Sequence, residues 1–334
     1  MVFKNLRVSG LPAPVKVAND LGNALRNLLR PNSPSGLGFP NVDHLRIPKN
    51  IVEARVTQQQ CIAHLHLLEQ FVSAKTKVIM WADHNSIQRH SAWNFYVNMA
   101  VERMVKWFET SYRVNLSDAI PPLDVLMVWH AFLQSPEEWD KFVNLTRMNH
   151  YGWNWDILLS TLQMGDAGKC EITRDSVDIV QQIYPAPDLL KLIDLSTSFL
   201  QSGSPDDTTE YLTHLFLHRK PTHDFKAPNR HFNIRFDFHG AVDAQLGFAN
   251  RMLEYSWHRM YLVEHSNGPQ FDAAIERYKK FMSLVKFLPY IHSMEPQARE
   301  PPRLLVPALD IDLVWRTHML SPREFLERLE DSVR

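Results

Sequence analysis

Apolar residues recur at three- and four-residue spacings through much of the chain, which is the period of an amphipathic α-helix. The first such run covers about 50–75, and a second covers about 91–112. Two further helices are predicted over 174–184 and 187–201. The pattern therefore predicts a mainly α-helical protein with at most minor β or extended segments.

One segment departs from the helical period. Phe232, Ile234, Phe236 and Phe238 alternate with polar residues, which is the period of a β-strand. Four apolar residues are equally consistent with an extended segment packed on a helix, so both interpretations stay open. The residues just before them, 220–230, show no regular period, and we expect an irregular connection there.

A helix-turn-helix pattern occurs twice in the chain. The first copy begins Pro122-Leu-Asp-Val-Leu-Met-Val-Trp-His130, and the second begins Ala308-Leu-Asp-Ile-Asp-Leu-Val-Trp-Arg316. Each copy then reaches a Ser-Pro pair, at Ser135 and at Ser321, where serine suits the N-cap and proline suits the first helical turn. Each copy therefore predicts two helices joined by a tight turn.

Two more blocks repeat in the same order as the motif copies. Ile51-Val-Glu-Ala matches Ala241-Val-Asp-Ala, and Ala100-Val-Glu-Arg matches Ala274-Ile-Glu-Arg. Three blocks in one order indicate an internal duplication of a helical domain. The predicted organisation is an N-terminal arm (1–41), a first helical repeat (42–145), a divergent middle segment (146–229) and a second helical repeat (230–334).

Polar residues lie on motif helices that are otherwise apolar enough to be buried. In the first copy, His130 is expected to be enclosed. In the second copy, Asp312 stands in the place of Leu126 and Arg316 in the place of His130. These two residues are four apart, where side chains on a helix meet. We predict a partly buried, bidentate ion pair between them.

The motifs resemble those of the glycine-rich domain-containing protein-like (GRDP-like) family, found in plants and fungi. The family pattern has a proline-rich lead, then D-x-D-x-x-W-H-x-H, a leucine and a Ser-Pro or similar turn. An Arg-Tyr-x-x-Phe helix usually precedes it. Here Arg277-Tyr278 with Phe281, followed by Val306 to His318, keeps that order. The resemblance covers roughly residues 40–334.

The chain departs from the family pattern at the two histidines. The first copy keeps His130 but has Phe132 in place of the second histidine, whereas the second copy has Arg316 and keeps His318. The chain has only 11 glycines and no glycine-rich tail, which suits a fungal-type member. The RNA-recognition domain that plant relatives can carry is not found in the sequence. The resemblance implies a helical architecture rather than a reaction.

Aspartate beside W-H-x-H suggests a metal site. Residues two apart on a helix point about 200° apart, so one helix cannot supply all the ligands. A site would have to pool ligands from both copies, namely Asp124, His130, Asp310 and His318. Because each copy lacks one histidine and an arginine has entered the face, we expect a structural polar network and no cofactor.

The leading prediction is a non-enzymatic binding or scaffold protein. The alternative is an enzyme or a metal-dependent protein with a pocket between the two repeats. The candidate residues of that pocket are the polar and indole side chains of both copies: Asp124, Trp129, His130, Asp310, Asp312, Trp315, Arg316 and His318. No nucleophile elbow, phosphate loop or dinucleotide-binding glycine motif occurs. The catalytic residues of any reaction stay unassigned.

Charge and composition narrow the partners. The net charge of -1 gives no overall attraction to nucleic acid or anionic lipid. No run of about 18 apolar residues predicts a membrane span. The two cysteines, Cys61 and Cys170, form no disulfide framework and indicate a reducing compartment. We expect a soluble protein of the cytoplasm, or of the nucleus, with a protein partner or a small ligand.

Overall fold

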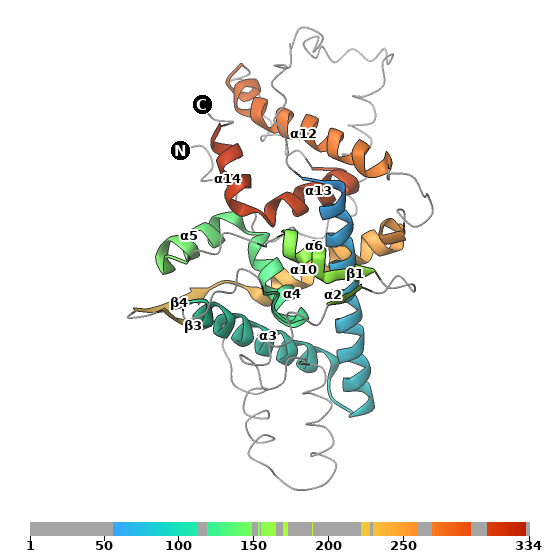
Figure 1. Cartoon of the computed structure of the whole chain (residues 1–334), viewed down its shortest axis with the longest axis vertical. Coiled ribbons are helices and arrows are strands. Elements are labelled where there is room, and N and C mark those ends of the chain that lie inside the picture. Colours follow the sequence, from blue (N-terminus) through green and yellow to red (C-terminus); the bar gives the residue numbers. More distant parts are fainter. Residues whose placement is uncertain are drawn as a thin grey trace, which may run out of the picture.

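Helices dominate the structure, so the prediction of a mainly α-helical protein is confirmed (Figure 1). The computed structural model describes residues 56–112, 119–148, 153, 155–164, 170–172, 189, 222–227, 230–259, 269–294 and 306–331. None of the helices in these ranges is both long and apolar enough to cross a membrane. The predicted arm over 1–41 lies outside the described residues, as do the predicted helices over 174–184 and 187–201 apart from Leu189.

The first half of the described chain is built of four main helices. They are α2 (Gln58–His84), α3 (Arg89–Ser111), α4 (Leu123–Leu133) and α5 (Pro136–Thr146). A capping box starts α2, because the Thr57 hydroxyl accepts from the Gln60 backbone N–H and the Gln60 side chain accepts from the Thr57 N–H. The predicted helix near 50–75 thus begins later and continues to His84. The pair α4 and α5 is the predicted hairpin, with Ser135 at the turn.

The second half repeats this order of helices. It contains α10 (Phe238–Glu254), η4 (Trp257–Arg259), α12 (Pro269–Met294), α13 (Leu309–Met319) and α14 (Pro322–Asp331). The pair α13 and α14 forms the second hairpin, and Ser321 lies between its helices. The order fits the duplication that the sequence predicts, which stays a prediction.

The described strands form two small antiparallel hairpins. Following α6 (Trp155–Thr161), β1 (Leu162–Met164) pairs with β2 (Cys170–Ile172), and β3 (Thr222–Ala227) pairs with β4 (Arg230–Arg235). The strand interpretation of the alternating segment is correct as far as Arg235, and Phe238 already belongs to α10. The expectation of an irregular connection over 220–230 was wrong. Pairing with β4 and burial of Phe225 against Phe142 make a strand where the local period gave no signal.

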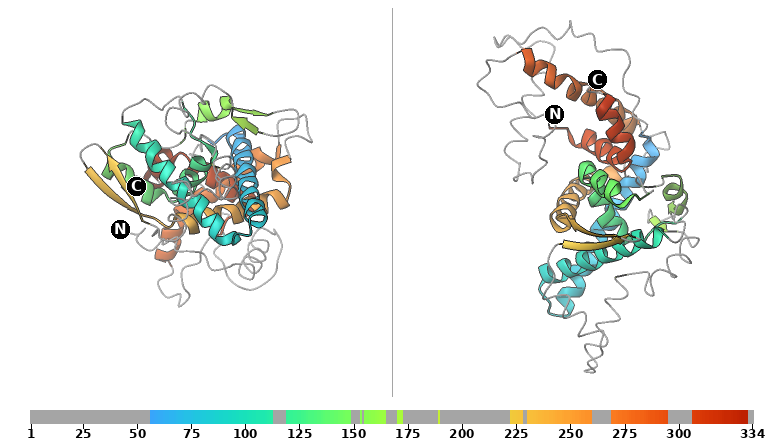
Figure 2. Two further views of the ribbon diagram at one scale, coloured as in Figure 1. Left: turned by 90° about the horizontal axis from the view of Figure 1, so that it is seen from below. Right: turned by 90° about the vertical axis from the view of Figure 1, so that its left-hand side faces the viewer.

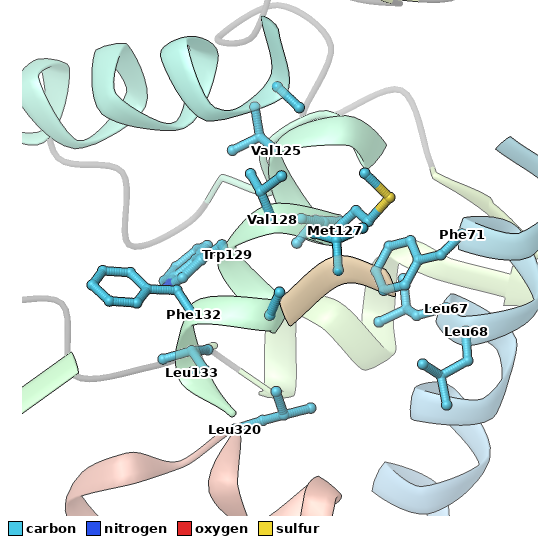
Figure 3. Close-up of a cluster of buried hydrophobic side chains, with 14 of the residues drawn as sticks. Leu67, Leu68, Phe71, Val125, Met127, Val128, Trp129, Phe132, Leu133 and Leu320 are labelled. Carbon is cyan, nitrogen blue, oxygen red and sulfur yellow. The ribbon is translucent and has the colours of Figure 1, made fainter. Parts of the chain in front are cut away.

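The two predicted halves share one hydrophobic core. Helix α2 runs from α13 to the start of α3, along the length of the molecule (Figures 1 and 2). It packs on α3 and α4 of its own half and on α10, α12 and α13 of the other. In Figure 3, Leu67 and Phe71 of α2 lie near Met127 of α4, and Leu320 closes the cluster at the end of α13. Because α10 likewise packs on α2, α3 and α4, the core is continuous across both halves.

Candidate functional site

A chain of polar contacts joins four helices at the centre of the molecule. His64 of α2 and His130 of α4 meet through their Nε2 atoms, 2.7 Å apart. His64 Nδ1 lies 2.8 Å from Thr317 Oγ1 of α13, and His130 Nδ1 lies 2.7 Å from Gln245 Oε1 of α10. The Thr317 hydroxyl also donates to the Leu313 carbonyl oxygen at 2.8 Å. We call His64, His130, Gln245 and Thr317 the histidine joint.

The histidine joint is closed to solvent and uncharged. Each of its four residues is at most 1% exposed. Burial lowers the pKa of His130 to about 3; the hydrogen bond to Gln245 opposes this shift, and the charge of Arg316 adds to it. Burial also lowers the pKa of His64 well below its ordinary 6.5, as do His130 and Arg316. Both rings are therefore neutral at pH 7, and each can donate one hydrogen and accept another.

The ion pair predicted within the second motif copy borders the joint. Arg316 Nε donates to Asp312 Oδ1 at 3.0 Å, through a single hydrogen bond in place of the bidentate geometry that we expected. The two side chains are 21% and 20% exposed. The guanidinium carbon of Arg316 lies 4.5 Å from the centroid of the Phe248 ring, and the Arg316 carbonyl accepts from the Gln134 side chain. The pair therefore stands at the edge of the core rather than within it.

The aspartates in the first turn of each motif helix bind arginines outside the joint. Arg103 of α3 donates from Nε to Asp124 Oδ2 at 2.7 Å, with both side chains at least nine-tenths buried. Arg277 of α12 donates from Nε to Asp310 Oδ2 at 2.6 Å, but half of the Arg277 side chain is exposed. The same type of ion pair thus occurs at matching positions of the two motif copies.

His318 is buried but separate from the joint. Its Nδ1 lies 2.7 Å from the Tyr278 hydroxyl of α12. Its ring meets the ring of Phe325 edge to face, with centroids 5.3 Å apart. His318 therefore joins α13 to α12 and α14 within its own half.

The two motif tryptophans pack against aromatic rings of the long helix that precedes each copy. Trp129 meets Phe108 of α3 at a centroid distance of 5.4 Å, and Trp315 meets Phe281 of α12 at 5.5 Å. Both indoles are thus part of the packing between helices.

The structure does not gather the proposed metal ligands in one place. Of Asp124, His130, Asp310 and His318, only His130 belongs to the joint, and the other three have the separate partners given above. Within the described ranges, no group of three or more His, Cys, Asp or Glu side chains could hold a metal ion. Of the other predicted residues, only Asp312 and Arg316 lie near the joint.

Three residues of the joint were missed by sequence reasoning: His64, Gln245 and Thr317. Residues two apart on a helix point in different directions, and His66 accordingly lies beside Glu69, away from the joint. The contacts of His64 span 66 and 253 residues of sequence. The only local signal was a polar residue inside an apolar helical run.

Two comparisons with known proteins agree with the motifs. The profile of the glycine-rich domain-containing protein-like family matches residues 207–327, which include α10, α12 and α13. Glycine-rich domain-containing protein 1 of Arabidopsis thaliana is 26% identical over 230 residues, which are 67% of this chain and 22% of that protein. The chain thus spans about a fifth of that relative's length, and no solved structure matches it. Both matches support the similarity to the GRDP-like family that the motifs indicate, and the profile match lies within residues 207–327.

Proposed function

We propose that this chain is a non-enzymatic binding or scaffold protein of the GRDP-like family. The supporting observation is that the polar side chains of the motif copies are already bound to other side chains of the protein, most of them on neighbouring helices. The pairs are Asp124 with Arg103, Asp310 with Arg277, Asp312 with Arg316, His318 with Tyr278, and His130 with His64. Catalytic groups must reach a substrate, whereas these contacts fix helices relative to one another.

In this proposal the histidine joint is a mechanical part of the scaffold. It connects α2, α4, α10 and α13, so the outer faces of these helices keep constant positions. Such fixed faces suit a protein partner or a small ligand, because little conformational freedom is lost on binding. The balanced charge disfavours nucleic acid as the partner. We place the protein in the cytoplasm.

The test separates binding from turnover. The purified full chain is incubated with an extract of its own cells, and mass spectrometry follows the small molecules and the captured proteins. We expect a reproducible bound partner and no compound consumed beyond one equivalent of protein. A double variant, Arg103→Met with Asp124→Leu, replaces the buried ion pair by apolar side chains and is expected to keep the partner.

The outcome against the proposal is also defined. Consumption of many equivalents of one compound by the native chain, lost in the folded double variant, would show that Arg103 or Asp124 has a chemical role. The alternative function, an enzyme or metal-dependent protein with a pocket between the repeats, would then hold.

A further inference from the structure

We propose that the outer edge of β4 binds an extended acidic segment of a partner protein, which adds a strand to the hairpin of β3 and β4. This inference rests on the proposed binding function and names the chemistry of the partner. The hairpin lies at the rim of the molecule in the view from below (Figure 2).

The first argument is the edge of the strand. Among the described residues this sheet consists of β3 and β4, so β4 has a strand on one side only. Helix α3 packs on β3, whereas the main neighbour of β4 is β3 itself. Along an edge strand, alternate backbone N–H and C=O groups point away from the partner strand and can pair with another chain. The outer edge of β4 therefore offers a backbone template for an added strand.

The second argument is the difference between the two faces of β4. His231, Asn233 and Arg235 point to one face and are exposed. On the other face, Ile234 is 6% exposed and Phe232 is partly buried against the core. Burial of the apolar face fixes the register of the strand, so the three polar side chains are held at constant positions.

The charge of β4 indicates which strand would be added. Arg230 and Arg235 are exposed, and neither forms an ion pair with a carboxylate of the described residues. By contrast, the exposed Arg89 of α3 binds Asp83 at 2.7 Å. The two arginines of β4 are thus available to carboxylates of a partner. They also repel the same edge of a second copy, so they favour an acidic strand over self-pairing.

The spacing of the exposed side chains specifies the peptide. In an antiparallel strand laid along β4, the residues opposite Arg235 and His231 are four apart and share the exposed face. Aspartate or glutamate at both places would lie beside the guanidinium and the imidazole, which has an N–H to donate in either protonation state. The residue opposite Phe232 turns to the apolar face and should be aliphatic. The expected order is acidic, any residue, polar, aliphatic, acidic.

Other anionic partners fit this edge less well. Nucleic acid and anionic membranes bind through broad basic surfaces, and the whole chain has a net charge of -1. Phosphate groups cannot continue a backbone ladder between strands. A peptide can use the backbone groups and the basic side chains of β4 together, so a peptide is the partner that accounts for both.

The experiment measures binding of the labelled peptide Ser-Glu-Thr-Thr-Val-Glu-Ser to the full chain by fluorescence anisotropy. Arg235→Glu should weaken binding about tenfold, because like charges then face each other. A peptide with lysine in place of the first glutamate should bind this variant more tightly than it binds the native chain. The matched control is Arg251→Glu, at an exposed arginine of α10, which should bind both peptides as the native chain does.

A modified peptide tests the backbone ladder separately from the charges. Methylation of the alternate peptide amides that face β4 removes their N–H donors and keeps both carboxylates, so binding should be lost. Hydrogen exchange gives a second readout. In the free chain, alternate amides of Arg230–Arg235 should exchange rapidly, and the unmodified peptide should slow them.

Four results would overturn the inference. Equal binding of the methylated and unmodified peptides would show a contact of charges without an added strand. Absence of peptide binding to the native chain would exclude an acidic strand, whether or not RNA or phosphatidylserine vesicles bind there instead. Slow exchange of every β4 amide in the free chain would show that another segment of the chain covers the edge. Capture of a partner that binds independently of Arg235 would contradict this inference and leave the proposed function intact.

Discussion

The two motif copies form the same helical hairpin, but they place side chains of different polarity at matching positions. Phe132 of the first copy meets Trp139 edge to face, with centroids 5.3 Å apart and an interplanar angle of 87°. At the matching place in the second copy, His318 meets Phe325 at 5.3 Å and 81°. The ring geometry is nearly the same, but His318 needs a polar partner and has one in Tyr278. The hairpin thus tolerates a change of ring polarity where a neighbour supplies a hydrogen bond.

The ion pairs of the two copies differ in burial and not in chemistry. Arg103–Asp124 and Arg277–Asp310 have the same chemistry and almost the same length. Burial separates them: the first arginine is 9% exposed and the second is 50% exposed. The two ion pairs should therefore contribute unequally to the free energy of unfolding, although their geometry is nearly equal.

The largest effect is expected when the buried ion pair loses its arginine. Arg103→Met leaves Asp124 buried without its counter-charge, so the free energy of unfolding should fall by about 3–5 kcal/mol. Arg277→Met removes a half-exposed partner and should cost about 1 kcal/mol or less. Urea unfolding of both variants measures the difference. Equal losses would mean that burial does not distinguish the two copies.

A second contrast is in the response to acid. The folded pKa of His130 is about 3 and its ordinary value is 6.5, so the unfolded chain takes up the proton first as the pH falls. The stability from the neutral ring is complete above about pH 6.5 and declines toward pH 3. At pH 5, His130 alone should lower the free energy of unfolding by about 2 kcal/mol. The matching position in the second copy is occupied by Arg316 instead of a histidine.

Urea unfolding at pH 7 and at pH 5 measures this acid response. His130→Gln should have a smaller difference between the two pH values than the native chain has. A control variant, His66→Gln, keeps the buried pair and should retain most of the acid response. An unchanged difference in His130→Gln would show that other groups cause it.

A smaller effect is expected at the polar partner of His318. Tyr278→Phe removes the hydroxyl and leaves a buried ring nitrogen without that bond, at a cost of about 1–2 kcal/mol. The first copy has Met104 and Phe132 at the matching positions. The double variant Tyr278→Met with His318→Phe should therefore recover part of the loss. Thermal unfolding of the single and double variants decides whether the two positions compensate.

The smallest effect is expected at the edge of the joint. Asp312→Leu introduces the residue that the first copy has at this position, Leu126, and removes the partner of Arg316. Because both side chains are about a fifth exposed, the loss should be about 1 kcal/mol or less, below that of a fully buried pair. Measured in low and high salt, the loss should shrink as salt screens the pair. If the free energy of unfolding fell by several kcal/mol, water would not reach the Asp312–Arg316 pair.

Local signals in the sequence predicted the features with short-range causes. The hairpins were predicted because Ser135 and Ser321 lie next to prolines that suit a first helical turn. The contact between Asp312 and Arg316 was predicted because it spans one turn of helix. Enclosure of His130 was predicted because its helix is apolar almost all round, and it is 1% exposed.

The missed features depend on partners far away in the chain. The strand β3 could not be predicted from its own period, because β4 provides its hydrogen bonds. Gln245 and His64 looked ordinary on their helices, and their roles come from His130, 115 and 66 residues away. The arginine partners of Asp124 and Asp310 could have been predicted from the sequence. Arg103 and Arg277 end the matching blocks of the repeat, as Asp124 and Asp310 open the matching motif helices.

The reach of His64 has a consequence for the synthesis of the protein. Its contact in α13, Thr317, follows 253 residues later. At roughly 5–20 residues per second, the ribosome needs about 10–50 s to make that stretch. Throughout this time the apolar face of α2 has no α13 to cover it. Nascent chains of this protein should therefore depend on chaperones until the last hairpin leaves the ribosome.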